Sequence, residues 1–314
     1  MVNLIAQVGA NHRGSLDSAL EHLHAAKDAG ANAARFQTSY TQDVEPKNSA
    51  ALRPADMVKL HSEAQALRID FLSTPFDFAT VDFLDSLPVP AFKVASGDLT
   101  NLPLLAHIAH TGRPIYIATG MSDIGEVSDA ISVCRRHGNQ DITLLHCVSL
   151  LPTPHDRANL RAICTLERTF ELPVGYADHT IGNEACLAAV ALGATMIEKH
   201  FALKRYRDSP DKEVAANLRQ LIALRRGIDI IAQALGDGRK VPQEGEIEVA
   251  EIARRSVFSA RALKRGELLT PDLLTCHCPG TGIPASQFGE IIGHRLKLDL
   301  PADEMLQWDM LEGV

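Results

Sequence analysis

The sequence predicts an α/β protein in which a TIM (β/α)8 barrel is followed by a small β-rich domain. Short apolar runs alternate eight times with longer stretches of helical period over about the first 235 residues. No G-x-G-x-x-G string follows the first apolar run, which argues against a dinucleotide-binding open sheet. Beyond residue 236 the pattern changes to short β-like runs and turns.

The length supports two domains. A chain of 314 residues and 34.0 kDa is near the upper limit for one hydrophobic core. Glycine and proline punctuate residues 236–242, which is typical of a linker. We therefore expect a barrel over 1–236, a linker over 237–253 and a second domain over 254–314.

Composition excludes several classes of protein. The net charge is −8, from 31 basic and 39 acidic residues, so a nucleic acid partner is not expected. The longest apolar stretch is broken before the ~20 residues of a membrane span. We expect no membrane association. Six cysteines without a charged and apolar leader indicate a reduced, cytoplasmic chain.

Each expected strand is a short apolar run that ends in polar residues. The runs cover residues 4–9, 33–37, 70–75, 91–96, 114–120, 142–149, 174–179 and 195–201. The helices between them include 15–29, with Ser15 as N-cap and Gly30 as the stop, and 183–192, stopped by Gly193. The last barrel helix is expected over 212–235.

Candidate functional residues lie at the ends of these strands, because the chemistry of a TIM barrel is found at the carboxyl ends of its strands. They are Arg35, Gln37, Thr74, Lys93, Ser96, Asp98, Thr119, Ser149, His179 and His200. Asp98 and Asp211 are candidates for acid/base work or hydroxyl binding, although a lone aspartate after a strand is often a turn or cap residue.

Two histidines are candidate metal ligands. Glu198 and His200 lie two residues apart and share one face of a strand, and His179 ends the neighbouring strand. Two imidazoles and a carboxylate suit a divalent metal that acts as a Lewis acid. The alternative is that one histidine only caps the barrel core through hydrogen bonds.

Two cations lie on otherwise apolar strands. Arg35 and Lys93 would be buried, and an unpaired buried ion is strongly unfavourable. They predict a phosphate or carboxylate site, assisted by hydroxyl groups and backbone N–H groups. Two alternatives stay open: a buried ion pair with Glu198 or Asp98, and a Schiff-base lysine at Lys93 or Lys199.

Eight strings in the chain are similar to the motifs of the sialic acid synthase family. They are residues 5–14 (IAQVGANHRG), 35–38 (RFQT), 73–76 (STPF), 93–98 (KVASGD), 119–121 (TGM), 147–154 (CVSLLPTP), 178–182 (DHTIG) and 197–201 (IEKHF). The tail from residue 255 to residue 309 resembles the antifreeze-like (SAF) domain that follows the barrel in that family. The resemblance covers essentially the whole chain.

This resemblance implies a reaction. The family condenses phosphoenolpyruvate with an open-chain N-acylamino sugar to give a 2-keto-3-deoxy acid and phosphate, with manganese or magnesium. It implies His179 and His200 as metal ligands and Lys93, Thr74 and Ser96 as phosphoenolpyruvate ligands. Arg35 stands in place of a phosphate-binding lysine, and Asp211 resembles the aspartate that holds the sugar hydroxyls. It also implies a domain-exchanged homodimer.

The chain departs from the family pattern at several positions. Gln7 replaces a catalytic glutamate, and an amide cannot accept a proton as a carboxylate does. Asp98 is one methylene shorter than the usual glutamate. The remaining departures are Ala118 and Ala177 for serines, Leu151 for a tyrosine, Lys212 for a histidine and Cys278 for an arginine.

These observations leave three hypotheses. The first is a metal-dependent synthase that uses phosphoenolpyruvate and an aldose. The second is a paralogue that binds a sugar or phosphorylated ligand without turnover, favoured by Gln7, Ala118, Ala177 and Cys278. The third is a Schiff-base aldolase that uses free pyruvate.

Overall fold

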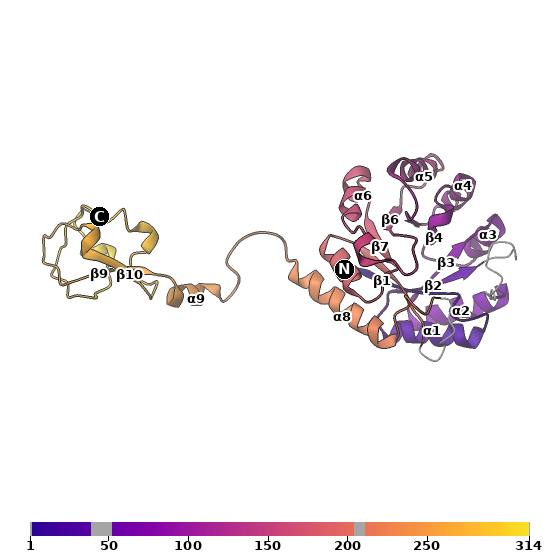
Figure 1. Ribbon diagram of the computed structural model, residues 1–314, viewed down its shortest axis with the longest axis horizontal. Helices are drawn as coiled ribbons and strands as arrows, with labels where there is room; N and C mark the ends of the chain where they lie inside the picture. The colour runs from indigo at the N-terminus through magenta and orange to yellow at the C-terminus, as the bar shows by residue number, and fades with distance from the viewer. Residues whose placement is uncertain (1, 39–51, 204–210, 314) are drawn as a thin grey trace. The chain divides into compact units, whose positions relative to one another are not determined.

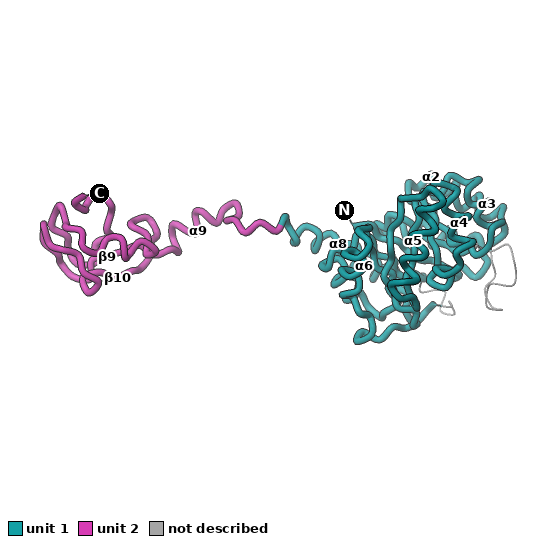
Figure 2. The backbone as a smooth tube through the Cα atoms, turned by 90° about the horizontal axis from the view of Figure 1, so that it is seen from above, with its two compact units in different colours: residues 1–237 teal, residues 238–314 magenta. Residues whose placement is uncertain are grey.

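The chain forms two compact units, each with its own hydrophobic core. The computed structural model describes residues 2–38, 52–203 and 211–313. Unit 1 spans Met1–Asp237 and unit 2 spans Gly238–Val314 (Figure 2). Within the described residues, no helix is both long and apolar enough to cross a membrane.

The strands of unit 1 close into a parallel barrel in which each strand pairs with the next and β8 pairs with β1. The strands are β1 (Asn3–Gly9), β2 (Ala33–Thr38), β3 (Asp70–Pro75), β4 (Phe92–Val94), β5 (Ile115–Ala118), β6 (Ile142–His146), β7 (Val174–Asp178) and β8 (Met196–His200). The predicted TIM barrel is confirmed.

Helices surround the barrel, as Figure 1 shows. They are α1 (Leu16–Asp28), α2 (Pro54–Leu67), α3 (Phe78–Ser86), α4 (Leu102–His110), α5 (Ile124–Arg136), α6 (Ala162–Phe170), α7 (Glu184–Ala191) and α8 (Leu218–Ala234). Local sequence fixes their ends. The Ser15 hydroxyl accepts the Ser18 N–H at the start of α1, and Gly30, with φ +79°, follows its end.

Two apolar layers hold unit 1 together. The larger lies between strands and helices and includes Leu23, Phe36, Leu60 and Phe92. The smaller fills the inside of the barrel with mostly small side chains, among them Ala33, Ala91, Ala118 and Ala177. Because these inner side chains are small, the longer polar side chains on the same strands have room inside the barrel.

Several strands are shorter than the sequence predicts. Strand β4 ends at Val94 and β6 ends at His146, so Ser96 lies in a short 3-10 helix after β4 and Ser149 lies in the loop after β6. Helix α8 begins at Leu218, not at residue 212. The Ala216 N–H donates to the His200 carbonyl, and Asn217 with Gln220 forms the capping box that starts the helix.

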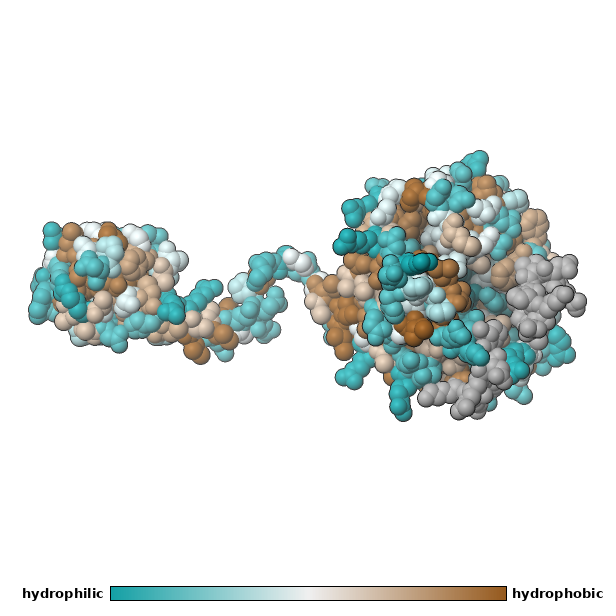
Figure 3. Space-filling view, viewed as in Figure 1, coloured by the Kyte–Doolittle hydropathy of each residue, from teal (hydrophilic) through white to brown (hydrophobic). Residues whose placement is uncertain are grey.

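Unit 2 has few regular elements. It contains α9 (Glu246–Ala253), within the segment expected as a linker, and the antiparallel pair β9 (Ser256–Ser259) and β10 (Leu274–His277). Its core is small and built mainly from leucines. Helix α9 buries none of its residues, and Ile247, Val249 and Ile252 are at least 60% exposed; Figure 3 shows the apolar surface over this helix.

Candidate active site

A buried group of three charges lies inside the barrel. Arg35 of β2, Lys93 of β4 and Glu198 of β8 are each at most 5% exposed. Arg35 Nε lies 3.3 Å from Glu198 Oε2, and Lys93 Nζ lies 3.6 Å from Glu198 Oε1. The ion pair with Glu198 that the sequence left open is therefore present.

The three charges do not balance. Two cations share one carboxylate, although burial lowers the pKa of Lys93 against the attraction of Glu198. Burial raises the pKa of Glu198, but Arg35 and Lys93 together outweigh that effect and hold it below its usual range. Among the residues that the structure describes, Arg35 Nε and Glu198 Oε2 also have no hydrogen-bond partner. This is an environment in which a second anion would be stabilised.

One of the two predicted threonine hydroxyl groups contacts a cation of the site. Arg35 Nη1 donates to Thr74 Oγ1 at 2.7 Å, and this threonine is fully buried. Thr119 is buried after β5 and donates to the Leu145 carbonyl. The structure thus gives Thr74 a direct contact with a site cation, whereas the contact of Thr119 is with the barrel backbone.

A small cradle lies where β5 and β6 end. The Gly120 N–H donates to Ser96 Oγ at 3.1 Å, and Ser96 Oγ lies 3.3 Å from Cys147 Sγ. A Cβ atom on Gly120 would lie 2.3 Å from Ser149 Oγ and 2.9 Å from both Cys147 Sγ and Ser96 Oγ. Only glycine fits there, so a backbone N–H and two predicted serines meet at one point.

The two candidate metal ligands lie side by side, with ring centroids 5.2 Å apart. His179 Nδ1 donates to the Val148 carbonyl at 2.7 Å, and His200 Nδ1 donates to Asp211 Oδ2 at 2.8 Å. When a ring of this kind is neutral, such a bond leaves Nε2 as the unprotonated nitrogen, and His200 Nε2 is buried with no hydrogen-bond partner among the described residues. Burial, and next the neighbouring His200, lowers the pKa of His179 to about 4, so this ring is neutral.

This arrangement fits a metal, because ligating histidines commonly donate their other nitrogen to a carboxylate or a carbonyl. Glu198 does not join them, since it pairs with the two cations. Across residues 2–38, 52–203 and 211–313, no three histidine, cysteine or carboxylate side chains are arranged to hold a metal together. The protein itself therefore offers two imidazoles.

Another group of polar residues lies beside Gly9, which has φ +55°. A Cβ atom there would lie 3.4 Å from Asp211 Oδ2 and within about 4 Å of Gln7 Nε2 and Gln37 Oε1. Gln7 is buried, and it is the register partner of both Arg35 and His200. The structure therefore brings Gln7, Gln37 and Asp211 together next to the histidine pair.

Asp98 has a different environment. It lies in the short 3-10 helix Ser96–Asp98, where its Oδ1 accepts Asn101 Nδ2 at 3.2 Å. Burial raises its pKa, partly offset by that hydrogen bond. Asn101 is the N-cap residue of α4, so Asp98 contacts the side chain of a cap residue.

Known proteins identify the family of this barrel. A model of the NeuB family matches residues 39–240, and a SAF domain model matches residues 254–312. The chain belongs to the NeuB family. Its resemblance to the sialic acid synthases is thereby confirmed, and the protein is an enzyme, a transferase of this type.

Relatives of this NeuB protein match over nearly its whole length. It is 41% identical to an uncharacterized protein of Methanocaldococcus jannaschii, over 99% of this chain and 94% of that protein. It is 35% identical to the N,N'-diacetyllegionaminic acid synthase of Legionella pneumophila, over 98% of this chain and 94% of that enzyme. The crystal structure of an N-acetylneuraminic acid synthetase from Leptospira borgpetersenii superimposes with a TM-score of 0.75 at 35% identity, covering 80% and 90% of the two chains.

Several positions that depart from the usual NeuB pattern are now located. Ala118 and Ala177 belong to the apolar layer inside the barrel, so their missing hydroxyls leave its wall apolar. Leu151 and Lys212 are exposed in unit 1, and Cys278 is exposed in unit 2. The polar losses therefore lie both inside the barrel and on exposed loops.

Lys199 is not a free amine for a Schiff base. It is 1% exposed, and its Nζ donates to Asp178 Oδ2 and to the Thr180 carbonyl, both at 2.6 Å. An ammonium held by a carboxylate has no lone pair with which to attack a carbonyl. Of the two lysines that the sequence proposed for this chemistry, only Lys93 lies with the other site residues.

Sequence reasoning missed part of the site. The sequence places Gly120 and Cys147 at strand ends and within motifs but gives neither a functional role, and it contains no signal for the Val148 carbonyl. The chain does contain one signal for the cradle, because a glycine follows a polar residue at the end of a strand.

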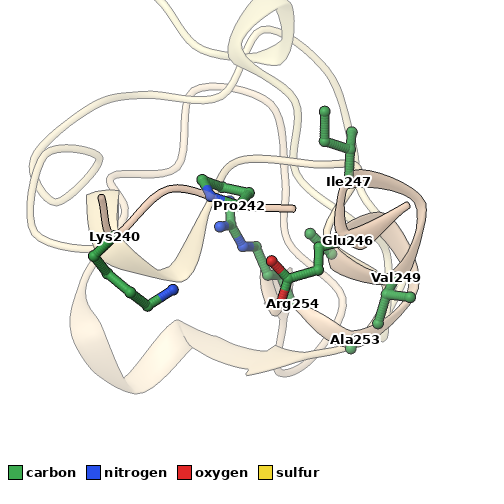
Figure 4. A pocket seen from close by; sticks show the side chains of 8 residues that line it. Lys240, Pro242, Glu246, Ile247, Val249, Ala253 and Arg254 are labelled. Atoms are coloured by element: carbon green, nitrogen blue, oxygen red, sulfur yellow. The ribbon is translucent and has the colours of Figure 1, made fainter. Parts of the chain in front are cut away.

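Two cavities lie among described residues of the two units. One of about 510 Å³ in unit 1 is lined by cradle residues Thr119, Cys147 and Ser149 and by side chains of α5 and α6. Another of about 380 Å³ lies in unit 2 around α9, where Lys240, Glu246 and Arg254 line it (Figure 4). Only the first cavity shares residues with the candidate site.

Proposed function

We propose that this NeuB protein joins phosphoenolpyruvate to the open-chain aldehyde of an N-acylamino sugar or a related aldose. The products would be a 2-keto-3-deoxy sugar acid and phosphate. The observation that carries the proposal is the buried excess of positive charge at Arg35 and Lys93 beside two histidines with anchored Nδ1 atoms.

Phosphoenolpyruvate is the anion that we assign to the two cations. Arg35 offers a bidentate fork and Lys93 a point charge, and together they can neutralise a phosphate or a carboxylate. The hydroxyl groups of Ser96 and Ser149 in the cradle, of Thr119 next to Gly120, and of Thr74 on Arg35 can supply hydrogen bonds to phosphoryl oxygens. As phosphate leaves, these groups stabilise its developing charge.

His179 and His200 are the residues that would hold a divalent ion, manganese or magnesium. Such an ion supplies Lewis-acid polarisation of the aldehyde oxygen. Val148 and Asp211 fix the tautomer and orientation of the two rings, so that both Nε2 atoms are available.

The remaining residues orient the acceptor. Asp211 and Gln37 lie together near Gly9 and can bind sugar hydroxyls. Gln7 can donate and accept hydrogen bonds there but cannot move a proton. In the reaction, C3 of phosphoenolpyruvate bonds to the aldehyde carbon and water adds at C2. Of the two water protons, one ends on the former aldehyde oxygen and the other leaves with phosphate, as the bond from C2 to the phosphate oxygen breaks and C2 becomes a carbonyl.

The acceptor that we propose is an N-acylamino sugar or a related aldose. Relatives carry the names N,N'-diacetyllegionaminic acid synthase, pseudaminic acid synthase and N-acetylneuraminate-9-phosphate synthase. Leu151, Lys212 and Cys278 replace polar contacts of the family, and a site without partners for an acyl group discriminates weakly in its favour.

The test is release of phosphate from phosphoenolpyruvate and Mn²⁺ against a panel of aldoses and N-acyl-hexosamines, each with and without a phosphate group. We expect turnover with at least one sugar, and a kcat/KM ratio for N-acetylmannosamine over mannose below ~10³. Release with none of the sugars would instead support the second candidate, a ligand-binding paralogue, which the buried amide of Gln7 favours.

We also propose a domain-exchanged homodimer. Unit 2 has a small core, and the apolar side chains of its helix α9 are exposed to solvent. This supports burial of α9 against another surface.

We also propose a cytoplasmic location. All six cysteines are described and unpaired, as expected in a reducing compartment.

A further inference from the structure

A second buried polar network lies directly behind the histidine pair. Its centre is Asp178, the last residue of β7, which is 1% exposed. Its Oδ1 accepts Tyr176 Oη at 3.0 Å and the Thr180 N–H at 2.8 Å. Its Oδ2 accepts Lys199 Nζ at 2.6 Å and Cys186 Sγ at 3.1 Å. Four donors therefore saturate this carboxylate.

The position of this network along the chain is what connects it to the site. Asp178 immediately precedes His179, and Lys199 immediately precedes His200. Asp178 and Lys199 are register partners across β7 and β8. The Lys199 ammonium also donates to the Thr180 carbonyl, so it binds the residue before His179 and the residue after it.

Side chains alternate along a strand, so residues next to the inward-facing histidines point away from the barrel interior. A buried ion pair on that outer side contacts no substrate and does no chemistry in the proposed reaction. Such a pair is weak as a source of stability, because removing two charges from water is costly. We therefore expect the Asp178–Lys199 ion pair to fix the geometry of the neighbouring histidines rather than to add to the stability of the fold.

We propose that Asp178 and Lys199 are positioning residues that clamp the ends of β7 and β8, and thereby fix the separation of the His179 and His200 rings. This inference rests on the proposed function only where it concerns metal binding. The clamp itself concerns only the backbone at residues 178–180 and 199–200, which it holds in place with or without metal.

The first experiment separates geometry from stability. In Lys199→Met the clamp is lost and Asp178 is left as an unpaired buried charge. In the double variant Asp178→Asn/Lys199→Met both charges are gone, so the thermal midpoint should recover while the clamp stays absent. Mn²⁺ affinity, measured by calorimetric titration, should fall about tenfold in both variants. Lys199→Arg, which keeps a charged donor, should bind Mn²⁺ nearly as the natural chain does.

Val81→Ala is the matched control. Val81 is fully buried in α3, away from β7 and β8, so its truncation lowers stability without touching the clamp. Recovery of both the midpoint and the Mn²⁺ affinity in the double variant would overturn the positioning role. So would an affinity loss in Val81→Ala equal to that in Lys199→Met.

A second readout does not depend on metal. Hydrogen exchange followed by mass spectrometry should show faster exchange in the peptides that contain residues 178–183 and 199–203 of the double variant, and unchanged exchange in α3. Unchanged exchange at 178–183 would overturn the clamp. If the natural chain binds no Mn²⁺, the metal part of the proposed function fails, and the exchange result alone decides the clamp. Should Lys199→Met not fold, Tyr176→Phe, which removes one donor to Asp178, should show the same local pattern with a smaller amplitude.

Discussion

Arg35 is the residue that distinguishes this site most clearly from a simple lysine-based anion site. Its guanidinium touches both Glu198 and Thr74 while it is nearly inaccessible to solvent. Arg35→Met should weaken phosphoenolpyruvate binding by about 2 kcal/mol, the scale of a charge-assisted hydrogen bond. Calorimetric titration measures this loss. Arg53→Met removes an exposed guanidinium paired with Asp56 and should leave the affinity unchanged. Equal affinity in Arg35→Met would mean that the anion binds elsewhere.

Each histidine of the pair should be needed for metal binding. His179→Ala and His200→Ala should each lose bound Mn²⁺, because either change removes one of the two imidazoles that the chain offers. Metal content after dialysis is the measurement. His155→Ala is the control, since His155 Nε2 donates to a backbone carbonyl in an exposed loop. Unchanged metal content in both site variants would contradict the assignment.

The charges of the site could be predicted from sequence, but their partners could not. Alternation along a strand placed Glu198 and His200 on one face, and that is correct. It gave no information on whether Glu198 would join the histidines or the cations. That choice depends on how far Arg35 and Lys93 reach across the barrel, which strand spacing alone does not determine.

The turn between β1 and α1 contains a histidine that responds to pH. The Gly14 N–H donates to His12 Nδ1, so the native turn requires a neutral ring. Burial, and next the neighbouring His22, lowers the pKa of His12 to about 4, whereas an unfolded histidine titrates near 6.5. Between these two pH values His12 is protonated in the unfolded chain but not in the folded chain. The free energy of unfolding therefore falls as pH drops from about 6.5 to about 4.

This loss should reach about 3 kcal/mol at the acid end of that window. Unfolding free energies from urea titrations at pH 7.5, 5.5 and 4.5 should fall less steeply in His12→Gln, whose amide does not titrate. Because other buried groups also titrate in this range, the difference between the two proteins is the informative quantity. Parallel pH profiles would show that His12 does not cause the loss.

At the scale of elements, the order and type of the barrel strands could be predicted, but their ends could not. The sequence predicts Ser96 and Ser149 at strand termini, but both lie beyond them. After Val94 the backbone turns into a 3-10 helix, in which the Asp98 N–H donates to the Ala95 carbonyl. The start of α8 was wrong by six residues. Helical periodicity continues upstream of Leu218, but the Ala216 N–H is already bonded to the His200 carbonyl.

The proposed homodimer should be visible in the mass of the whole molecule in solution. Light scattering at micromolar concentration should report twice the chain mass of 34.0 kDa. Changing Ile247 and Ile252 to Glu should shift the mass toward the monomer, because these exposed apolar side chains would carry charge into a buried interface. A matched double change at Ile222 and Ile230 of α8, which are also exposed, should not. A monomeric natural chain would contradict the dimer.

The unequal charges inside the barrel also affect how well the protein resists proteolysis. Arg35 and Lys93 repel each other around one carboxylate, so a small anion that binds only the folded chain would stabilise it by mass action. Under the proposed function, the phosphate product would be such an anion. A molecule with phosphate in the barrel unfolds less often, and a protease has fewer chances to cut it. The abundance of this enzyme would then rise with the phosphate content of its surroundings.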